Sequence, residues 1–417
     1  MQRRHLLRAI VAVAALALFG VQPVSAGSLR AGASRVEITP PEGTPLSGYA
    51  ARKGAPSTGV HDPLHARALV LDDSATQLAI VTVDLIGTDP VLTRRVARQS
   101  GFPAERLMIC SSHTHSGPGA FSQSPFAVIA GGAYKKDVQE LLITSMADAI
   151  KKAVANLQPA RIGTGETELK GFQRNRRGSP QVDPSLWVLR VDRADGAPLA
   201  LLANLTAHGT VLEDENLEFS ADWMGFFCAR LEAELPGSVA LYANGAEGDI
   251  SPNIPAGTSG FEAAKAHGEL GAQAALTLAR SLEMRGETTL AFRTAPLETP
   301  NTLKATLLGA SKKITLQTFT IDQSVLISVP GELTTALGLV LKEHGRRQGF
   351  RHAVIMGLAN DHLGYILTRA EMKKGGYEAG VSFFGDDFGE TLIRALGGLL
   401  GGDLAPLEEA LKRASQP

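Results

Sequence analysis

The stretch RLMICSSHTHSGPG, residues 106–119, joins a short apolar run to a polar turn that holds two histidines. The run RLMIC is typical of a buried β-strand. His113 and His115 follow it with one residue between them, and on an extended chain this spacing directs both side chains to one face. By itself the stretch leaves two interpretations open: a metal-binding pair at the end of a strand, or two exposed loop histidines.

The same pattern, an apolar strand that runs into polar residues, recurs along the chain and sets the expected fold class. Strand-like runs include QLAIVTVDLIG (77–87), LALLANLTAHG (199–209), SVALYANG (238–245) and HAVIMGLAN (352–360). Helical apolar spacing marks residues 137–157, 260–282 and 333–345. This mixture predicts an α/β protein whose sheets are covered by helices. No linker divides the chain, so we expect one large domain, with residues 298–304 as the nearest approach to a seam.

Composition narrows the chemistry. The chain has 417 residues, of which 44% are hydrophobic, which is ample for a large core. The formal net charge is −1 and no basic stripe with interleaved aromatics is present, so nucleic acid is not an expected partner. The two cysteines, Cys110 and Cys228, fall in apolar segments and are expected to be buried small hydrophobes rather than ligands. A metal site would therefore have to use His, carboxylate or Tyr.

The first 26 residues resemble a secretory signal rather than part of the fold. MQRRHLLR is a positively charged start, AIVAVAALALFGV is an apolar run, and small residues precede a cut near Ala26. The apolar run is short for a bilayer span, which needs about 20 apolar residues. We expect residues 1–26 to be a cleaved signal peptide and the protein, residues 27–417, to be exported to the periplasm or secreted. An uncleaved membrane anchor is the lesser alternative.

Three further polar clusters sit where apolar strands end. His208 ends the run at 199–209, and a histidine there could equally be a satisfied core residue. The loop NGAEGDISPN (244–253) carries Glu247, Asp249 and Ser251, and is either a turn-rich loop with local hydrogen bonds or a backbone that approaches a ligand closely. Glu332 ends the segment SVPGE. It could be a metal ligand, the first-turn acid of a helix that begins at about Leu333, or both.

A last polar loop spans residues 358–380 and holds Asp361, His362, Tyr365 and Tyr377. The clusters together suggest a metal bound by His, His, Glu and Tyr, a ligand set that suits Zn²⁺. A thiolate site is excluded, and no carboxylate-rich Ca²⁺ loop is visible.

Residues 31–385 resemble the neutral/alkaline, non-lysosomal ceramidase family. The resemblance rests on five features in a fixed order: AGASRVEITPP, SSHTHSGPG, NGAEGDISPN, PGE and the pair Tyr365 and Tyr377. The resemblance implies a zinc amidase that cleaves the N-acyl bond of ceramide into a sphingoid base and a fatty acid. It also implies the catalytic N-terminal domain only, in a short member without the C-terminal β-sandwich domain. The expected fold is α/β, with mixed β-sheets covered by helices in a four-layer αββα-like arrangement.

The resemblance also assigns roles to residues. The zinc ligands would be His113, His208, Glu332 and Tyr365. The catalytic residues would be His115, beside the reacting group, Arg176 and Tyr377, at the oxyanion, and Ser251, as a nucleophile or a contact. The segment NRRGSP departs from the family's NRSP, so Arg177 competes with Arg176 for its role, and the substrate is less certain than the zinc chemistry.

Two mechanisms stay open at this point: attack by a metal-activated water with His115 moving the proton, which we favour, and attack by Ser251 through an acyl-enzyme. The expected partner is a lipid-like N-acyl substrate, and a membrane surface is the place where we expect the two to meet. The sequence identifies no protein partner. The alternatives are a zinc hydrolase of another N-acyl or ester substrate, and, from another class, a non-catalytic exported binding protein on the same fold.

Overall fold

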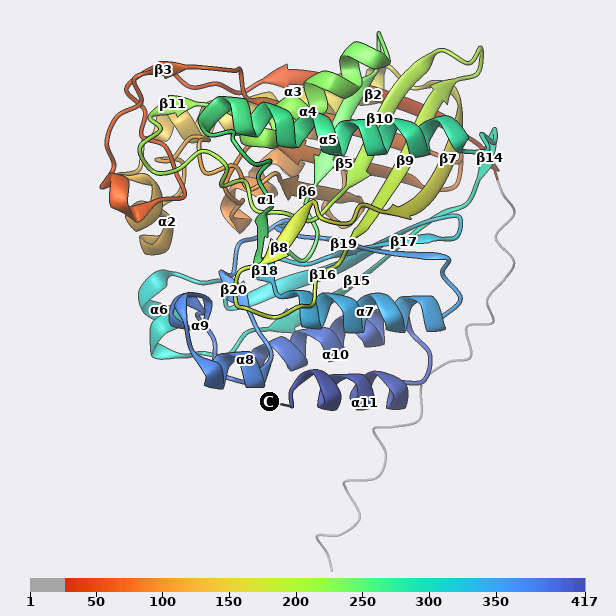
Figure 1. Ribbon diagram of the computed structural model, residues 1–417. Helices are drawn as coiled ribbons and strands as arrows, with labels where there is room; N and C mark the ends of the chain where they lie inside the picture. The colour runs from red at the N-terminus through yellow and green to blue at the C-terminus, as the bar shows by residue number, and fades with distance from the viewer. Residues whose placement is uncertain (1–26, 417) are drawn as a thin grey trace, which may run out of the picture.

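The computed structural model describes residues 27–416, so the predicted signal peptide at 1–26 lies outside the described residues. Two stacked sheets form its centre (Figure 1). The larger sheet is eight-stranded, with the order β12-β10-β9-β7-β2-β4-β5-β6. In that order its strands are Val239–Ala243, Pro198–Asn204, Ser185–Arg193, Gln158–Glu168, Arg30–Glu37, His65–Asp72, Gln77–Val83 and Leu107–Ser111.

The smaller sheet is four-stranded and has the order β15-β16-β17-β19. Its strands are Leu290–Glu298, Lys313–Ile321, Ser324–Ser328 and His352–Met356. Short two-stranded pairs complete the set: β1 (Gly27–Ser28) with β14 (Glu287–Thr288), β3 (Gly59–Val60) with β11 (Glu218–Phe219), β8 (Gln173–Asn175) with β13 (Ile250–Pro252), and β18 (Glu332–Leu333) with β20 (Tyr365–Ile366).

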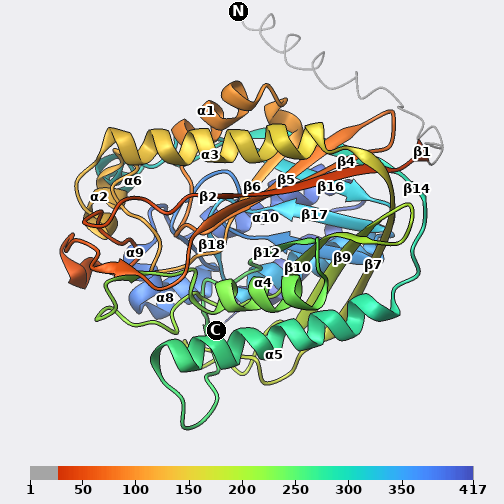
Figure 2. The ribbon, with the colours of Figure 1, turned by 90° about the horizontal axis from the view of Figure 1, so that it is seen from above.

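Helices cover the outer face of each sheet (Figures 1 and 2). Over the larger sheet lie α1 (Pro90–Ser100), α3 (Lys136–Ala155), α4 (Asp222–Glu234) and α5 (Gly260–Ser281). Over the smaller sheet lie α7 (Thr335–Arg347), α10 (Phe388–Leu400) and α11 (Ala405–Ala414). The short helices α2 (Pro125–Gly131), α6 (Leu303–Leu308), α8 (Arg369–Lys374) and α9 (Tyr377–Val381) surround one end. The predicted four-layer αββα arrangement is confirmed.

Alternation along the strands explains why two apolar layers can share one sheet. On β5, Leu78 and Ile80 face the second sheet, whereas Val81 and Val83 face the helices. Both faces of this strand are dry, so its sequence is apolar almost throughout, as expected for a strand buried on both sides. The layer between the sheets joins residues from both, Leu202 and Phe319 among them, so the two sheets share one core.

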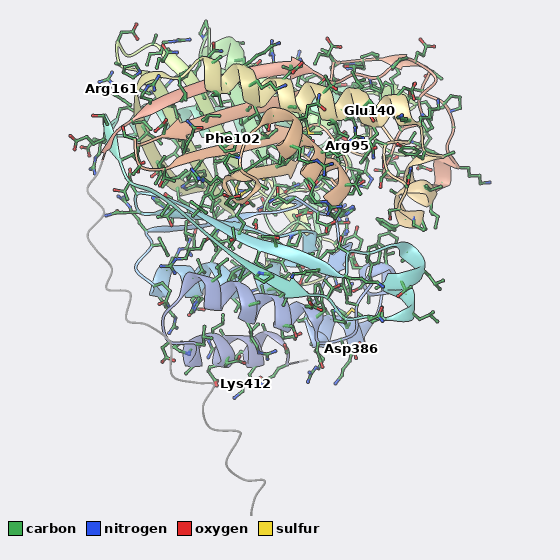
Figure 3. The ribbon with its side chains drawn as sticks, turned by 180° about the vertical axis from the view of Figure 1, so that it is seen from behind. Arg95, Phe102, Glu140, Arg161, Asp386 and Lys412 are labelled. Atoms are coloured by element: carbon green, nitrogen blue, oxygen red, sulfur yellow. The ribbon has the colours of Figure 1, made fainter. Side chains whose placement is uncertain are left out.

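The helix α1 shows how local signals set a boundary. Asp89 caps its first turn by accepting hydrogen bonds from the amides of Val91 and Leu92, and Gly101 ends it in a left-handed conformation. On its outer side Arg95 forms an ion pair with Glu140 of α3 at 2.6 Å, and Figure 3 labels both. Exposed pairs of this kind contribute little to stability, so the apolar face of α1 holds the helix in place.

Three parallel strand pairs end in the same region between the sheets. Parallel pairing aligns β10 with β12, β5 with β6, and β17 with β19. Cross-links tie these ends together: the amide of Gly357 donates to the Asn244 carbonyl at 2.9 Å, and that of Ser111 donates to the Leu358 carbonyl at 3.3 Å. The loops after these strands therefore meet, which is where the sequence places its polar clusters.

Cys110 and Cys228 are both buried and unbridged, and burial raises the pKa of each thiol to about 12. They behave as the small hydrophobes that the sequence predicted. Among residues 27–416, no helix has the length and apolar character needed to cross a bilayer.

The buried His267 of α5 generates a prediction about acid stability. Its ring stacks on Phe172 with the centroids 3.9 Å apart, and burial lowers its pKa to about 4. As pH falls from about 6.5 to 4, the unfolded chain takes up this proton and the native state does not, so folding stability falls by up to about 3 kcal/mol. We expect His267→Leu to lose less stability over this range in urea unfolding. Equal slopes in the variant and in wild type would contradict the assignment.

Candidate metal centre

His113 is held by the backbone that follows β5. It lies just after β6, in the left-handed conformation with φ 69°, and is 1% exposed. Its amide donates to the Leu85 carbonyl at 3.0 Å, and its Nδ1 lies 2.7 Å from the Ile86 carbonyl. The carbonyl can only accept, so Nδ1 carries the proton and Nε2 presents a lone pair.

His208 is held in the same way by the loop after β12. It is 1% exposed, and its Nδ1 lies 2.9 Å from the Glu247 carbonyl and 3.1 Å from the Ile250 carbonyl. Its Nε2 therefore also presents a lone pair. Burial lowers the pKa of His208 to about 3, so the ring is neutral at physiological pH.

Glu332 completes the group, and its position corrects one expectation. Glu332 does not begin a helix, because Glu332 and Leu333 form β18 and α7 starts at Thr335. Parallel pairing of β18 with β20 sets Glu332 directly beside Tyr365. The Glu332 Oε2 atom lies 3.5 Å from His113 Nε2 and 3.3 Å from His208 Nε2, while Oε1 lies 3.1 Å from the Nε2 of His362.

These three facing atoms fit a cation. His113 Nε2, His208 Nε2 and Glu332 Oε2 are all acceptors, and Oε2 is buried without a hydrogen-bond partner among the described residues. Buried acceptors without donors are costly, and a divalent cation removes that cost by accepting all three lone pairs. Two imidazoles and a carboxylate are the donors expected of a catalytic zinc site, which keeps a further position open.

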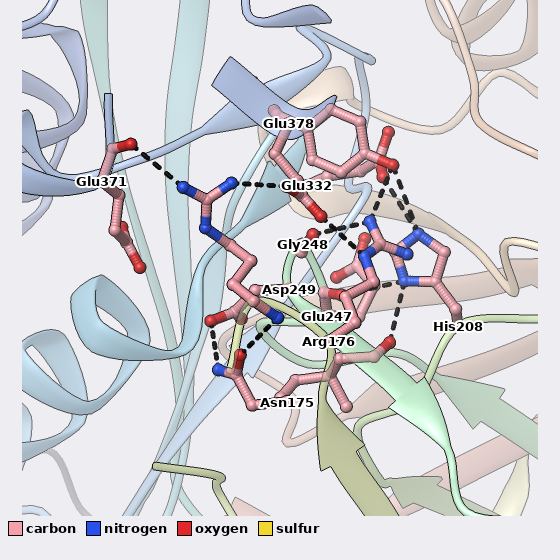
Figure 4. A network of polar contacts seen from close by, with 12 residues as sticks. Asn175, Arg176, His208, Glu247, Gly248, Asp249, Glu332, Glu371 and Glu378 are labelled. Carbon is pink, nitrogen blue, oxygen red and sulfur yellow. Dashed lines mark hydrogen bonds and ion pairs between the residues drawn. The ribbon is translucent and has the colours of Figure 1, made fainter. Parts of the chain in front are cut away.

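Tyr365 and Arg176 border the same point, and Figure 4 labels Arg176 together with His208 and Glu332. The Tyr365 hydroxyl lies 3.5 Å from His208 Nε2 and accepts from Arg176 Nη2 at 3.0 Å. Arg176 is anchored by Glu378 and by the Gly248 carbonyl, each at 2.8 Å. Burial raises the pKa of Tyr365 well above its usual value, and a bound cation would lower it.

Arg176 and not Arg177 occupies the position beside Tyr365. Arg177 turns toward Glu378 and toward the carbonyls of Glu371 and Gly375. Its guanidinium therefore ties the loop at 371–378 to the end of β8, and the alternative left open by the sequence is settled in favour of Arg176 for contact with the site.

His115 lies close to His113 and His208, with one ring nitrogen of each of the three within 4.8 Å of the others. It is 8% exposed, with Nε2 3.3 Å from His113 Nε2 and its ring centroid 4.7 Å from that of Tyr49. Gly48 lies against the ring, where a Cβ would approach within 2.6 Å, and Arg52 donates to the His115 carbonyl. Burial lowers the pKa of His115 well below its usual value, so the ring is neutral and can accept a proton.

Tyr377 and Ser251 differ in how they relate to this group. Tyr377 begins α9 and is 67% exposed. It lines a cavity that opens above the histidines, and its ring centroid is 5.8 Å from that of Tyr365. Ser251 lies on β13 opposite Arg174, does not line the cavity, and its hydroxyl makes no hydrogen bond to another described residue. The structure therefore brings Tyr377 to the cavity and leaves Ser251 out of its lining.

A cavity of about 750 Å³ opens above the histidines. Its floor includes His113, His115 and Glu332. One wall is apolar. It includes Phe121 and, from helix α2, Phe126, Ala127 and Ala130. The apolar wall favours a ligand with an apolar part.

Four residues near this cluster had no assigned role in the sequence: Tyr49, Arg52, Glu247 and His362. His362 shares its polar loop with Tyr365, which is the one signal that could have suggested it. Tyr49 and Arg52 precede the first histidine motif by more than sixty residues, and no local pattern connects them to it.

Glu247 is the least expected of these residues. It is 0% exposed, and neither carboxylate oxygen has a hydrogen-bond partner among the described residues. One ligand atom from each of His113, Glu247 and Glu332 lies within 4.8 Å of the other two. Burial, followed by the charge of Glu332, raises the pKa of Glu247 well above its usual value. At 4.8 Å two unit charges repel by about 3 kcal/mol at an effective dielectric constant of about 20.

Comparison with known proteins gives consistent matches. The sequence profile described as neutral/alkaline non-lysosomal ceramidase, N-terminal, matches residues 29–266. A neutral ceramidase of Pseudomonas aeruginosa is 24% identical over 79% of this chain and 65% of its own length. Neutral ceramidase A of Dictyostelium discoideum is 27% identical over 54% of this chain and 36% of its own length. The chain therefore spans less than two thirds of each of these relatives.

The fold is also similar to that of a solved protein. The crystal structure of a neutral ceramidase from Pseudomonas aeruginosa superposes with a TM-score of 0.80 at 23% identity, over 92% of this chain and 75% of that one.

Metal content tests the predicted ligands. We expect His208→Ala to lose the bound divalent ion, because it removes one of the two lone pairs that face Glu332, whereas His115→Ala keeps it. Metal analysis of protein purified with zinc and desalted gives the ratio per chain, with His61→Ala as a control away from the site. A full complement of metal in His208→Ala would contradict the ligand set.

Proposed function

The chain belongs to the neutral/alkaline non-lysosomal ceramidase family, and on that premise we propose that it is a zinc-dependent amidase. Its substrates would be ceramide-like lipids, cleaved at the N-acyl bond to a sphingoid base and a fatty acid. One observation carries the proposal: His113, His208 and Glu332 turn acceptor atoms toward one point beside a cavity with an apolar wall, and the Glu332 oxygen there has no hydrogen-bond partner among the described residues.

The proposed ligands are His113, His208, Glu332 and Tyr365. Zinc bound there would polarise the amide carbonyl and lower the pKa of water from about 15.7 toward 7. The His/His/Glu set favours zinc over calcium or magnesium, which prefer oxygen donors.

We assign the proton transfers to His115. Its neutral ring could take a proton from the attacking water as the new C–O bond forms, and deliver it to the nitrogen as the C–N bond breaks. Arg52 and Tyr49 position this ring. Arg176 and Tyr377 are proposed to stabilise the oxyanion, where the loss of one donor typically costs about 2.7–4 kcal/mol.

Direct attack by Ser251 is the competing mechanism. It needs a base within hydrogen-bonding reach, and no described residue accepts a hydrogen bond from the Ser251 hydroxyl. Attack by water is therefore the mechanism that we propose.

Turnover of a labelled N-acyl lipid panel tests function and mechanism together. We expect hydrolysis of ceramides, a kcat about 10²–10⁴-fold lower in His115→Gln with zinc retained, and near wild-type turnover in Ser251→Ala. Preferential cleavage of N-acyl amino acids or esters would favour the zinc hydrolase of another substrate. Zinc binding without cleavage of any compound would favour the non-catalytic binding protein. An acyl adduct trapped on Ser251 would restore the serine mechanism.

We further propose that the cavity mouth meets a lipid surface. Large apolar side chains are exposed on α2 and α6, namely Val128, Ile129, Leu303 and Leu307. The two helices are adjacent, since Ser124 at the start of α2 donates to the Leu308 carbonyl at 2.9 Å. Helix α2 also lines the cavity, so a lipid could pass from the surface to the site without crossing water.

Vesicle binding tests this proposal. Ile129→Ser combined with Leu303→Ser should reduce co-sedimentation with phosphatidylcholine vesicles and leave cleavage of a short-chain soluble substrate unchanged. Leu270→Ser, at an exposed leucine of α5, is the matched control. Unchanged sedimentation in the double variant would rule this surface out.

Export also belongs to the proposal. Residues 1–26 would be removed near Ala26, and N-terminal sequencing of protein recovered outside the cytoplasm would test it. An intact N-terminus on that fraction would favour the uncleaved anchor.

A further inference from the structure

We propose that Glu247 is an additional metal-binding carboxylate, so that this site holds a divalent cation between two carboxylates and two imidazoles. The inference rests on the metal site of the proposed function and adds a ligand that the family motifs did not suggest.

The backbone around Glu247 is fixed to the presumed ligands on both sides (Figure 4). The Glu247 carbonyl accepts from His208 Nδ1 at 2.9 Å. The next residue, Gly248, donates its amide to the Leu333 carbonyl at 2.8 Å, and a Cβ on it would lie 2.5 Å from the Glu332 carbonyl oxygen. The loop thus packs against both His208 and β18, so Glu247 cannot move away without displacing them.

The carboxyl group itself is enclosed. Gly357 lies beside it, where a Cβ would come within 3.0 Å of Glu247 Oε2. A larger residue at 357 would therefore press on the carboxyl group. Neither carboxylate oxygen receives a hydrogen bond from a described residue, and the side chain is fully buried. Such a group needs either a proton or a cation.

The nearby arginine makes no hydrogen bond to the Glu247 carboxyl group. Arg176 donates instead to Glu378, to the Gly248 carbonyl and to the Tyr365 hydroxyl. Ligand atoms of His113 and Glu332, both of the proposed metal site, lie within 4.8 Å of a Glu247 oxygen.

Charge balance favours a divalent ion. The hydrogen bonds of His113 and His208 to carbonyls leave Nε2 of each ring to the ion, and an imidazole binds a metal in its neutral form, so the negative charge of the site comes from Glu332 and Glu247. Two carboxylates balance one divalent cation. A bound ion would remove their mutual repulsion and give Glu247 the partner that it lacks.

The substitution Glu247→Gln separates this role from a purely structural one. If Glu247 were instead a protonated acid donating to Glu332, the amide of glutamine could replace that donor and zinc affinity would be kept. If Glu247 binds the ion as a carboxylate, the neutral amide is a poorer ligand and affinity falls. Removing an unpartnered buried charge should leave the metal-free fold as stable as wild type, or more stable.

The experiment compares wild type, Glu247→Gln and the control Glu390→Gln, which makes the same change at a buried glutamate of α10. Zinc affinity is measured by competition with a chromophoric chelator, and thermal unfolding is followed with and without zinc. We expect a dissociation constant about 10–100-fold higher in Glu247→Gln, a smaller zinc-induced rise in Tm, and an altered visible spectrum of the cobalt-substituted protein. Glu390→Gln should match wild type in zinc affinity and in the cobalt spectrum.

Wild-type affinity and cobalt spectrum in Glu247→Gln would overturn the inference, as would an equal loss of affinity in both variants. If wild type itself binds no divalent ion, the proposed metal-dependent function fails, and that outcome is distinct from failure at Glu247 alone.

Discussion

The site depends on two hydrogen bonds from imidazoles to backbone carbonyls. His113 Nδ1 is bonded to the Ile86 carbonyl and His208 Nδ1 to the Glu247 carbonyl. Each bond fixes a ring orientation and a tautomer, and each leaves Nε2 without its proton. The carbonyls belong to segments that follow β5 and β12, so the orientation of both rings depends on the packing of the larger sheet. Glu332 reaches the same point from the smaller sheet, which makes the alignment of the two sheets a condition of the site.

Burial gives this small group of atoms its chemical character. Glu332, Glu247, Tyr365 and three histidines lie in a region where water is largely excluded. There, charged forms are unfavourable unless a partner is present, so burial keeps His115 and His208 neutral and the carboxylates require a cation. The cavity above them remains open toward α2 and α9. Its polar floor and apolar wall suit a ligand that has a polar part and an apolar part.

The departures from sequence expectation have a common origin in long-range pairing. For Glu332 the sequence offers a first-turn acid as one alternative, because an acid before LTTALGLVLKEHG has the local pattern of a first turn. The pairing of β18 with β20 overrides that pattern, since residue 332 pairs with residue 365. The sequence shows His362 only as part of a polar loop, and its contact with Glu332 depends on the same pairing.

The sequence by itself determined the alternation of apolar strands and amphipathic helices, and the placement of His113, His208 and the 244–253 loop at strand ends. These features are local, because strand and helix periods and turn residues act within a few positions. The ordered motifs were also sufficient to identify the family. Only the tertiary structure decided that Arg176 rather than Arg177 meets Tyr365, that Tyr49 and Arg52 support His115, and that Glu247 lies enclosed and unpartnered beside Glu332. These relations join segments far apart in the chain, and they arise from strand register and burial, which no short stretch of sequence encodes.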